Sequence, residues 1–150
     1  METPQEILAY ARGRAQELKL PYAGALLPAE AYALMHSLPE ARLVDVRSRA
    51  ELEWVGQIPG SVAVEWNSWP GSNRNLNFVA DFEALIDKTA TVMLLCRSGV
   101  RSHHAAIVLA QVGYAHVYNV LQGFEGDKDP NGRRNLLGGW RAAGLPWKQG

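Results

Sequence analysis

Residues 91–102 read TVMLLCRSGVRS and are the most informative stretch of the chain. An apolar, strand-like run ends at Leu95, Cys96 follows at once, and a helix-like run begins near His103. A strand–loop–helix turn of this kind points backbone N–H groups and a helix N-terminus at whatever the loop encloses. The pattern therefore predicts a site that holds an anion or a thiolate at the end of a strand.

Cys96 is the only cysteine among the 150 residues. Positive charge from Arg97 and Arg101, together with a helix N-terminus, favours the reactive thiolate form. The alternative is a small apolar side chain at a strand end, since free cysteines are often buried. A single cysteine excludes an internal disulfide and a dithiol redox pair, so any sulfur bound to Cys96 has to leave to another molecule.

Short strand-like runs alternate with helical patterns from about residue 22 onward. Strands are expected at 43–46, 62–65, 91–95 and 117–121, and helices at 28–37, after Ser48, and at 78–86, 103–112 and 140–143. This order predicts a parallel sheet covered on both faces. Ligands bind beyond the carboxyl ends of such strands, which is where Cys96 falls.

The N-terminal segment carries its own helix signal. Thr3-Pro4-Gln5-Glu6 forms a capping box with proline at the first helical position, and apolar residues follow at helical spacing to Leu18. We expect residues 1–20 to form a helical extension packed on a domain that comprises residues 21–150.

Several motifs in their order resemble the rhodanese family of sulfurtransferases. They are the cysteine loop 96–102, Asp45-Val46-Arg47 with Glu51, the segment GQIPGS at 56–61, and Gly123-Phe124 after the last strand. The resemblance covers about residues 22–147, although Gln57 stands where the family often has histidine. It implies a single-domain, three-layer α/β sandwich with a central, mostly parallel five-stranded sheet and helices on both faces.

The resemblance also implies a thiosulfate sulfurtransferase. Cys96 is then the nucleophile that carries the sulfur as a persulfide, moving it from a small anionic donor to a thiol or, in vitro, to cyanide. The donor and the sulfur are bound by Arg97, Ser98, Gly99, Val100, Arg101 and Ser102. The guanidinium of Arg97 favours a thiosulfate-like donor. Ser98 and Ser102 either donate hydrogen bonds to the sulfur or cap the following helix.

Asp45 and Arg47 end a neighbouring strand, where they either line the site or support it. We expect the supporting role, with Arg47 paired to Glu51 and Asp45 bracing the loops. His103 and His104 follow in the first helical turn, where side chains commonly face solvent. A cycle that begins with a thiolate needs no dedicated base, so we assign these histidines no catalytic role.

Other functions use related features. A phosphatase or arsenate reductase uses a similar anion loop, but tyrosine-type phosphatases place arginine six residues after the cysteine, where this chain has Ser102. Two further alternatives keep the same fold. One is a regulatory domain that docks a partner, and the other is a sulfur relay to an acceptor protein whose identity the sequence leaves open. The complete loop around Cys96 favours the enzyme.

Composition bounds the partners. Fifteen basic and fifteen acidic residues give no formal net charge, so we expect neither nucleic acid nor membrane as a partner. No further cysteine or histidine cluster supports a metal site, and no cofactor is expected. The acidic N-terminus lacks the pattern of a secretory signal, which predicts a cytoplasmic protein. A compact domain with balanced charge is compatible with a monomer.

Overall fold

The computed structural model describes residues 2–67 and 74–149 and contains a five-stranded sheet in the order β1-β5-β4-β2-β3. The strands are β1 (Gly24–Leu26), β2 (Ala41–Asp45), β3 (Val62–Ala63), β4 (Thr91–Leu95) and β5 (Val117–Val120). Every neighbouring pair is parallel. The predicted α/β class and the parallel five-stranded sheet are confirmed.

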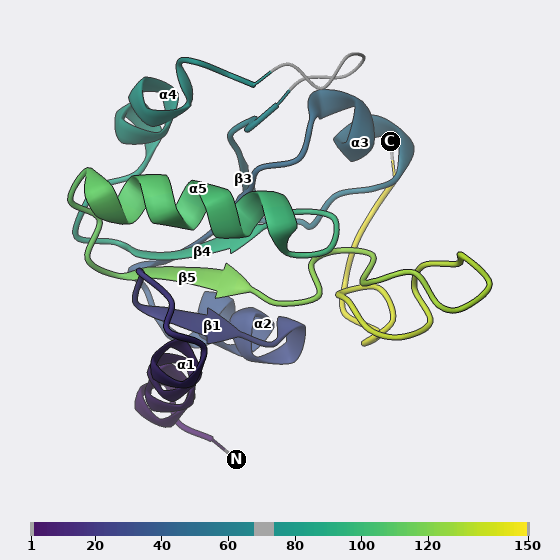
Figure 1. Ribbon diagram of the computed structural model, residues 1–150, viewed down its shortest axis with the longest axis horizontal. Coiled ribbons are helices and arrows are strands. Elements are labelled where there is room, and N and C mark those ends of the chain that lie inside the picture. The colour runs from purple at the N-terminus through teal and green to yellow at the C-terminus, as the bar shows by residue number, and fades with distance from the viewer. Residues whose placement is uncertain (1, 68–73, 150) are drawn as a thin grey trace.

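Helices cover both faces of this sheet, as Figure 1 shows. They are α1 (Pro4–Leu18), α2 (Pro28–Ser37), α3 (Arg49–Trp54), α4 (Phe78–Leu85) and α5 (Val100–Gln111). Side chains alternate across β4, so Val92 and Leu94 join the core beneath α4 and α5. Met93 and Leu95 join the core beneath α1 and α2. The strand that leads to the cysteine is therefore buried on both faces, as parallel strands generally are.

The N-terminal helix α1 begins at its predicted capping box, in which Thr3 Oγ1 accepts the Glu6 N–H at 3.2 Å. Ile7 and Ala11 are buried and belong to the same core as α2 and one face of the sheet. A Cβ at Gly24 would lie 2.8 Å from the Ala11 carbonyl carbon, so β1 and the backbone of α1 nearly touch. Helix α1 thus forms part of the layer that covers the sheet.

Two elements differ from the sequence expectation. Strand β1 is absent from the predicted set, because three residues between Tyr22 and Leu27 are too few to display a period. The predicted helix at Trp140–Ala143 is wrong, because this segment forms a turn. Its amides bond across the fold, with the Trp140 N–H donating to the Gly123 carbonyl at 2.8 Å. Within the described ranges, no helix is long and apolar enough to cross a membrane.

Candidate active site

Cys96 directly follows β4, the middle strand of the sheet. Its Sγ accepts the Gly99 N–H at 3.0 Å and lies 3.3 Å from Ser102 Oγ. Gly99 has φ +104° and is the residue that precedes the first turn of α5. This left-handed conformation, which suits glycine, folds the loop back over the sulfur. These polar contacts distinguish Cys96 from a buried cysteine that packs only against apolar groups.

The thiol lies beneath the loop and is only 1% exposed. The outer residues of the loop are open to solvent, since Val100 is 61% exposed and the side chain of Arg97 is 46% exposed. The Val100 side chain therefore faces solvent, whereas the sulfur of Cys96 is covered by the surrounding residues.

The chain after β5 supports the cysteine loop from behind. The Phe124 N–H donates to the Cys96 carbonyl at 2.8 Å, and the Glu125 N–H donates to the Arg97 carbonyl at 2.9 Å. Gly123 has φ +61°, and a Cβ there would lie 2.5 Å from the Cys96 carbonyl oxygen. Only glycine fits this position, which explains the glycine turn noted in the sequence.

Arg101 is locked by Glu51 rather than free for a donor. Its two terminal nitrogens donate to the two Glu51 oxygens at 2.6 and 2.8 Å. Burial alone would raise the pKa of Glu51, but Arg101 and the capping bonds from Ser48 hold it at about 2. Burial opposes the charge of Arg101, yet Glu51 and, more weakly, Cys96 and Asp45 raise the pKa of the guanidinium. Arg101 supplies a fixed positive charge near the sulfur.

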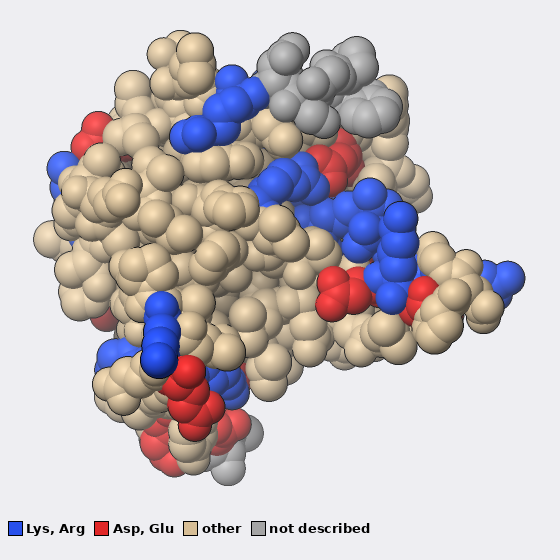
Figure 2. All heavy atoms as spheres, in the orientation of Figure 1, with Lys and Arg blue, Asp and Glu red and all other residues tan. Residues whose placement is uncertain are grey.

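Arg97 is held more loosely. Its Nε donates to one Glu125 oxygen at 3.0 Å, and Arg141 lies 3.8 Å from the other oxygen. Figure 2 shows basic and acidic groups side by side on this face, near the start of α5, whereas the middle of α5 carries neither. Arg97 is thus the more exposed and the less tightly paired of the two loop arginines.

Asp45 and Arg47 form a fully buried ion pair, with Arg47 Nη2 2.7 Å from Asp45 Oδ2. Arg47 also donates to the Gly56 carbonyl at 2.8 Å, and its guanidinium lies 4.2 Å from the centre of the Phe124 ring. The predicted pairing of Arg47 with Glu51 is wrong, because Glu51 is occupied by Arg101. The pair joins the end of β2 to the segment behind the cysteine loop.

Ser102 is buried, and its hydroxyl faces Cys96 and Asn119 instead of capping α5. The hydroxyl oxygen lies 2.5 Å from Asn119 Oδ1, while Asn119 Nδ2 donates to the Gly99 carbonyl at 3.1 Å. Ser98 is half-buried at the rim of the loop. Asn119 is a site residue that the sequence argument missed, since its position in a buried strand reads as core.

His103 does not face open solvent as expected. Its Nδ1 lies 2.7 Å from the Tyr22 hydroxyl, and burial, followed by the charge of His104, lowers its pKa. Burial raises the pKa of Tyr22 to about 12 against a smaller opposing hydrogen bond with Asn119. In the part of the chain that the structure describes, no three His, Cys, Asp or Glu side chains gather to hold a metal ion.

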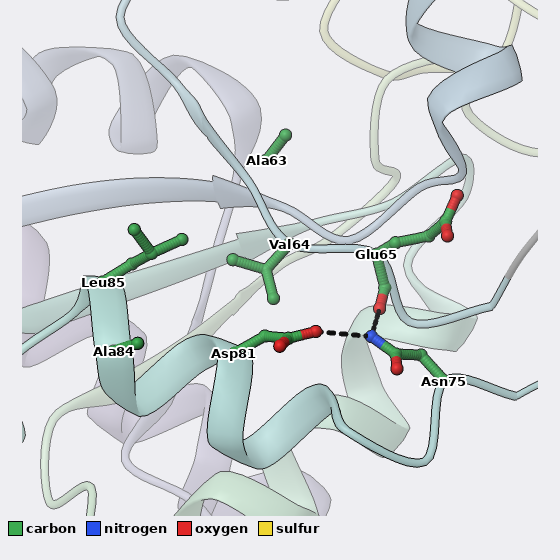
Figure 3. A pocket seen from close by; sticks show the side chains of 7 residues that line it. All are labelled: Ala63, Val64, Glu65, Asn75, Asp81, Ala84 and Leu85. Atoms are coloured by element: carbon green, nitrogen blue, oxygen red, sulfur yellow. Dashed lines mark hydrogen bonds between the residues drawn. The ribbon is translucent and has the colours of Figure 1, made fainter.

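A surface pocket of about 540 Å³ lies apart from the cysteine loop, between β3 and α4 (Figure 3). Its polar groups pair with one another, because Asn75 Nδ2 donates to Asp81 Oδ2 at 3.1 Å and to the Glu65 carbonyl at 2.9 Å. No residue of the loop lines it. The candidate chemistry belongs to the loop at Cys96.

In a comparison with known protein families, residues 27–129 match the family described as Rhodanese-like domain. Protein RC0915 of Rickettsia conorii is 36% identical over 123 residues, covering 79% of this chain and 92% of that protein. Thiosulfate sulfurtransferase GlpE of Pseudomonas aeruginosa is 34% identical over 85 residues, covering 57% and 67%. The crystal structure of Rv0390 from M. tuberculosis has a TM-score of 0.79 at 43% identity, covering 86% of this chain and 99% of that one.

Proposed function

This chain belongs to the rhodanese-like domain family, and from that premise we propose that it transfers sulfane sulfur from a thiosulfate-like donor through a persulfide on Cys96. The observation that carries the proposal is the position of Sγ. It sits at the end of the middle strand and accepts the Gly99 N–H at 3.0 Å, with the fixed charge of Arg101 nearby. A hydrogen-bond donor and a fixed positive charge are the surroundings in which cysteines commonly act as nucleophiles.

The proposed reaction has two displacement steps. The Cys96 thiolate attacks the outer sulfur of thiosulfate, a sulfur–sulfur bond forms, and the old one breaks to release sulfite. Cyanide, or a thiolate in its place, then attacks the outer sulfur of the persulfide. Thiocyanate leaves and the Cys96 thiolate returns. The Gly99 N–H stays directed at the inner sulfur throughout.

Donor binding is assigned to Arg97. Among the residues that the structure describes, Arg97 bonds to Glu125 through Nε and not through its terminal nitrogens, and its side chain is 46% exposed. Arg101 stays with Glu51, so its contribution is long-range attraction and the shape of the loop. This division modifies the sequence expectation that both arginines contact the donor.

Intact-mass measurement after exposure to thiosulfate tests the proposal. We expect a gain of one sulfur in the wild type and none in Cys96→Ser, with thiocyanate formed from cyanide by the wild type alone. Because Cys96 is the only cysteine of the chain, it is the only thiol to which the added sulfur can be attached. Val100→Ala is the matched control, since the Val100 side chain faces solvent.

Each alternative function predicts a different outcome, in this assay or in a phosphatase assay. A gain of sulfur without thiocyanate formation replaces the cyanide reaction with a relay to another acceptor. If the wild type gains no sulfur, the result favours a domain that docks a partner. Turnover of a phosphomonoester that is lost in Cys96→Ser identifies a phosphatase.

A further inference from the structure

A buried polar cluster lies behind the sulfur and joins α5 to β5. Asn119 is 3% exposed and Ser102 is fully buried. The Ser102 hydroxyl oxygen lies within bonding distance of two acceptors, Asn119 Oδ1 at 2.5 Å and Cys96 Sγ at 3.3 Å. A hydroxyl has one hydrogen to donate, so it satisfies one of them at a time.

The amide of Asn119 is fixed in the orientation that competes for this hydrogen. Its Nδ2 donates to the Gly99 carbonyl at 3.1 Å, which places Oδ1 toward Ser102. The opposite orientation would set Oδ1 against the carbonyl oxygen of Gly99, where neither group donates. Because sulfur is larger than oxygen, both distances allow a hydrogen bond, so the two acceptors compete for the one hydrogen.

We propose that Asn119 is a positioning residue, which competes with Cys96 for the Ser102 hydrogen and thereby sets the pH at which the sulfur becomes reactive. Ionised Cys96 draws the hydroxyl toward Sγ, and Asn119 Oδ1 then loses the hydrogen bond from Ser102. The loss of a buried hydrogen bond is unfavourable, so Asn119 opposes the anionic sulfur. The consequence for sulfur transfer rests on the proposed function, but the competition itself does not.

Two of the titratable groups near the loop, Glu51 and Tyr22, have pKa values far from the range of about 8–9 in which a free thiol ionises. The charged and titratable side chains placed around the loop are Arg97, Arg101, Asp45, Arg47, Glu51, Glu125, Tyr22 and His103. The pKa of Glu51 is about 2 and that of Tyr22 is about 12. Burial lowers the pKa of His103, so the imidazole is neutral above neutral pH. A change in the pH dependence of Cys96 reactivity in that range therefore reports on the sulfur and its hydrogen-bond partners.

The test is the pH dependence of iodoacetamide alkylation of Cys96, followed by intact mass. We expect Asn119→Ala to lower the midpoint by about one pH unit, the tenfold effect of one ordinary hydrogen bond. Ser102→Ala is expected to raise the midpoint, because the thiolate loses a donor. In the Ser102→Ala background, Asn119→Ala is expected to have no further effect.

Matched variants separate competition from a change in loop shape. Asn119→Leu fills the space and lacks the acceptor, so it should reproduce the downward shift if the alanine variant does not fold. Tyr118→Phe alters the neighbouring residue of β5, which belongs to the opposite core, and should leave the midpoint unchanged.

The proposal is overturned if the foldable Asn119 variants leave the midpoint in place or raise it. It is equally overturned if the shift persists without the Ser102 hydroxyl, because the effect would then pass through the Gly99 carbonyl. Failure of the wild type to take up sulfur would remove the proposed function, while the alkylation result would still decide the role of Asn119.

Discussion

Replacing Glu51 by glutamine should make the protein less stable and remove much of its acid sensitivity. The folded pKa of Glu51 is about 2, against an ordinary value of 4.5. At about 1.4 kcal/mol for each pH unit, this difference amounts to about 3 kcal/mol of stability. Because the folded pKa is depressed, this contribution is complete above pH 4.5 and disappears as the pH falls through about 2.

Urea unfolding of the wild type and Glu51→Gln from pH 7 to pH 2 measures this contribution. We expect the variant to be less stable by about 3 kcal/mol at pH 7, with the gap closing below pH 4.5. Glu83→Gln is the control, because Glu83 pairs with Lys88 at 3.2 Å where both side chains are largely exposed. That variant should differ from the wild type by less than about 0.5 kcal/mol. A gap for Glu51→Gln that stays constant down to pH 2 would show that the charge of Glu51 does not stabilise the folded protein.

Three further outcomes are expected. Arg97→Ala should raise the KM for thiosulfate about tenfold with kcat nearly unchanged, as thiocyanate kinetics will show, because one charged hydrogen bond to the donor is lost; an effect confined to kcat contradicts this role. Gly123→Ala should unfold at much lower urea concentration than Gly132→Ala, since both glycines have positive φ but an added Cβ meets backbone only at Gly123. Ile7→Ala should cost about 2–4 kcal/mol in the same measurement and Leu18→Ala below about 0.5 kcal/mol, because Ile7 is 4% and Leu18 58% exposed. Equal losses at Ile7 and Leu18 would show that α1 does not contribute to the core.

Local signals in the sequence predict the helices well. The capping boxes at Thr3 and Ser48 and the proline at residue 28 act within one turn, and α1, α2 and α3 begin where these signals stand. Strand β1 escapes prediction because its identity depends on pairing with β5, some 90 residues along the chain. A turn replaces the helix predicted at 140–143 because its first amides bond to distant carbonyls, Trp140 to Gly123 and Arg141 to Phe124.

The site shows the same division between local and distant information. The cysteine loop is contiguous, so its position after β4 follows from the order of residues alone. The partners of its charges come from distant segments: Glu51 pairs with Arg101 and not with the predicted Arg47, and Glu125 binds Arg97. Asn119 reads as an ordinary strand residue until β5 is placed beside β4. Only the assembled sheet shows that the buried amide of Asn119 contacts the cysteine loop.

The middle position of β4 has a consequence for how the protein fails under stress. Its neighbours β2 and β5 protect it on both sides, whereas the margins are the short strands β1 and β3. Fraying begins at margins, where fewer backbone bonds have to open. The amides that precede Cys96 should therefore be among the last in the molecule to exchange with deuterium. Cys96 should keep its position when the marginal strands β1 and β3 open locally.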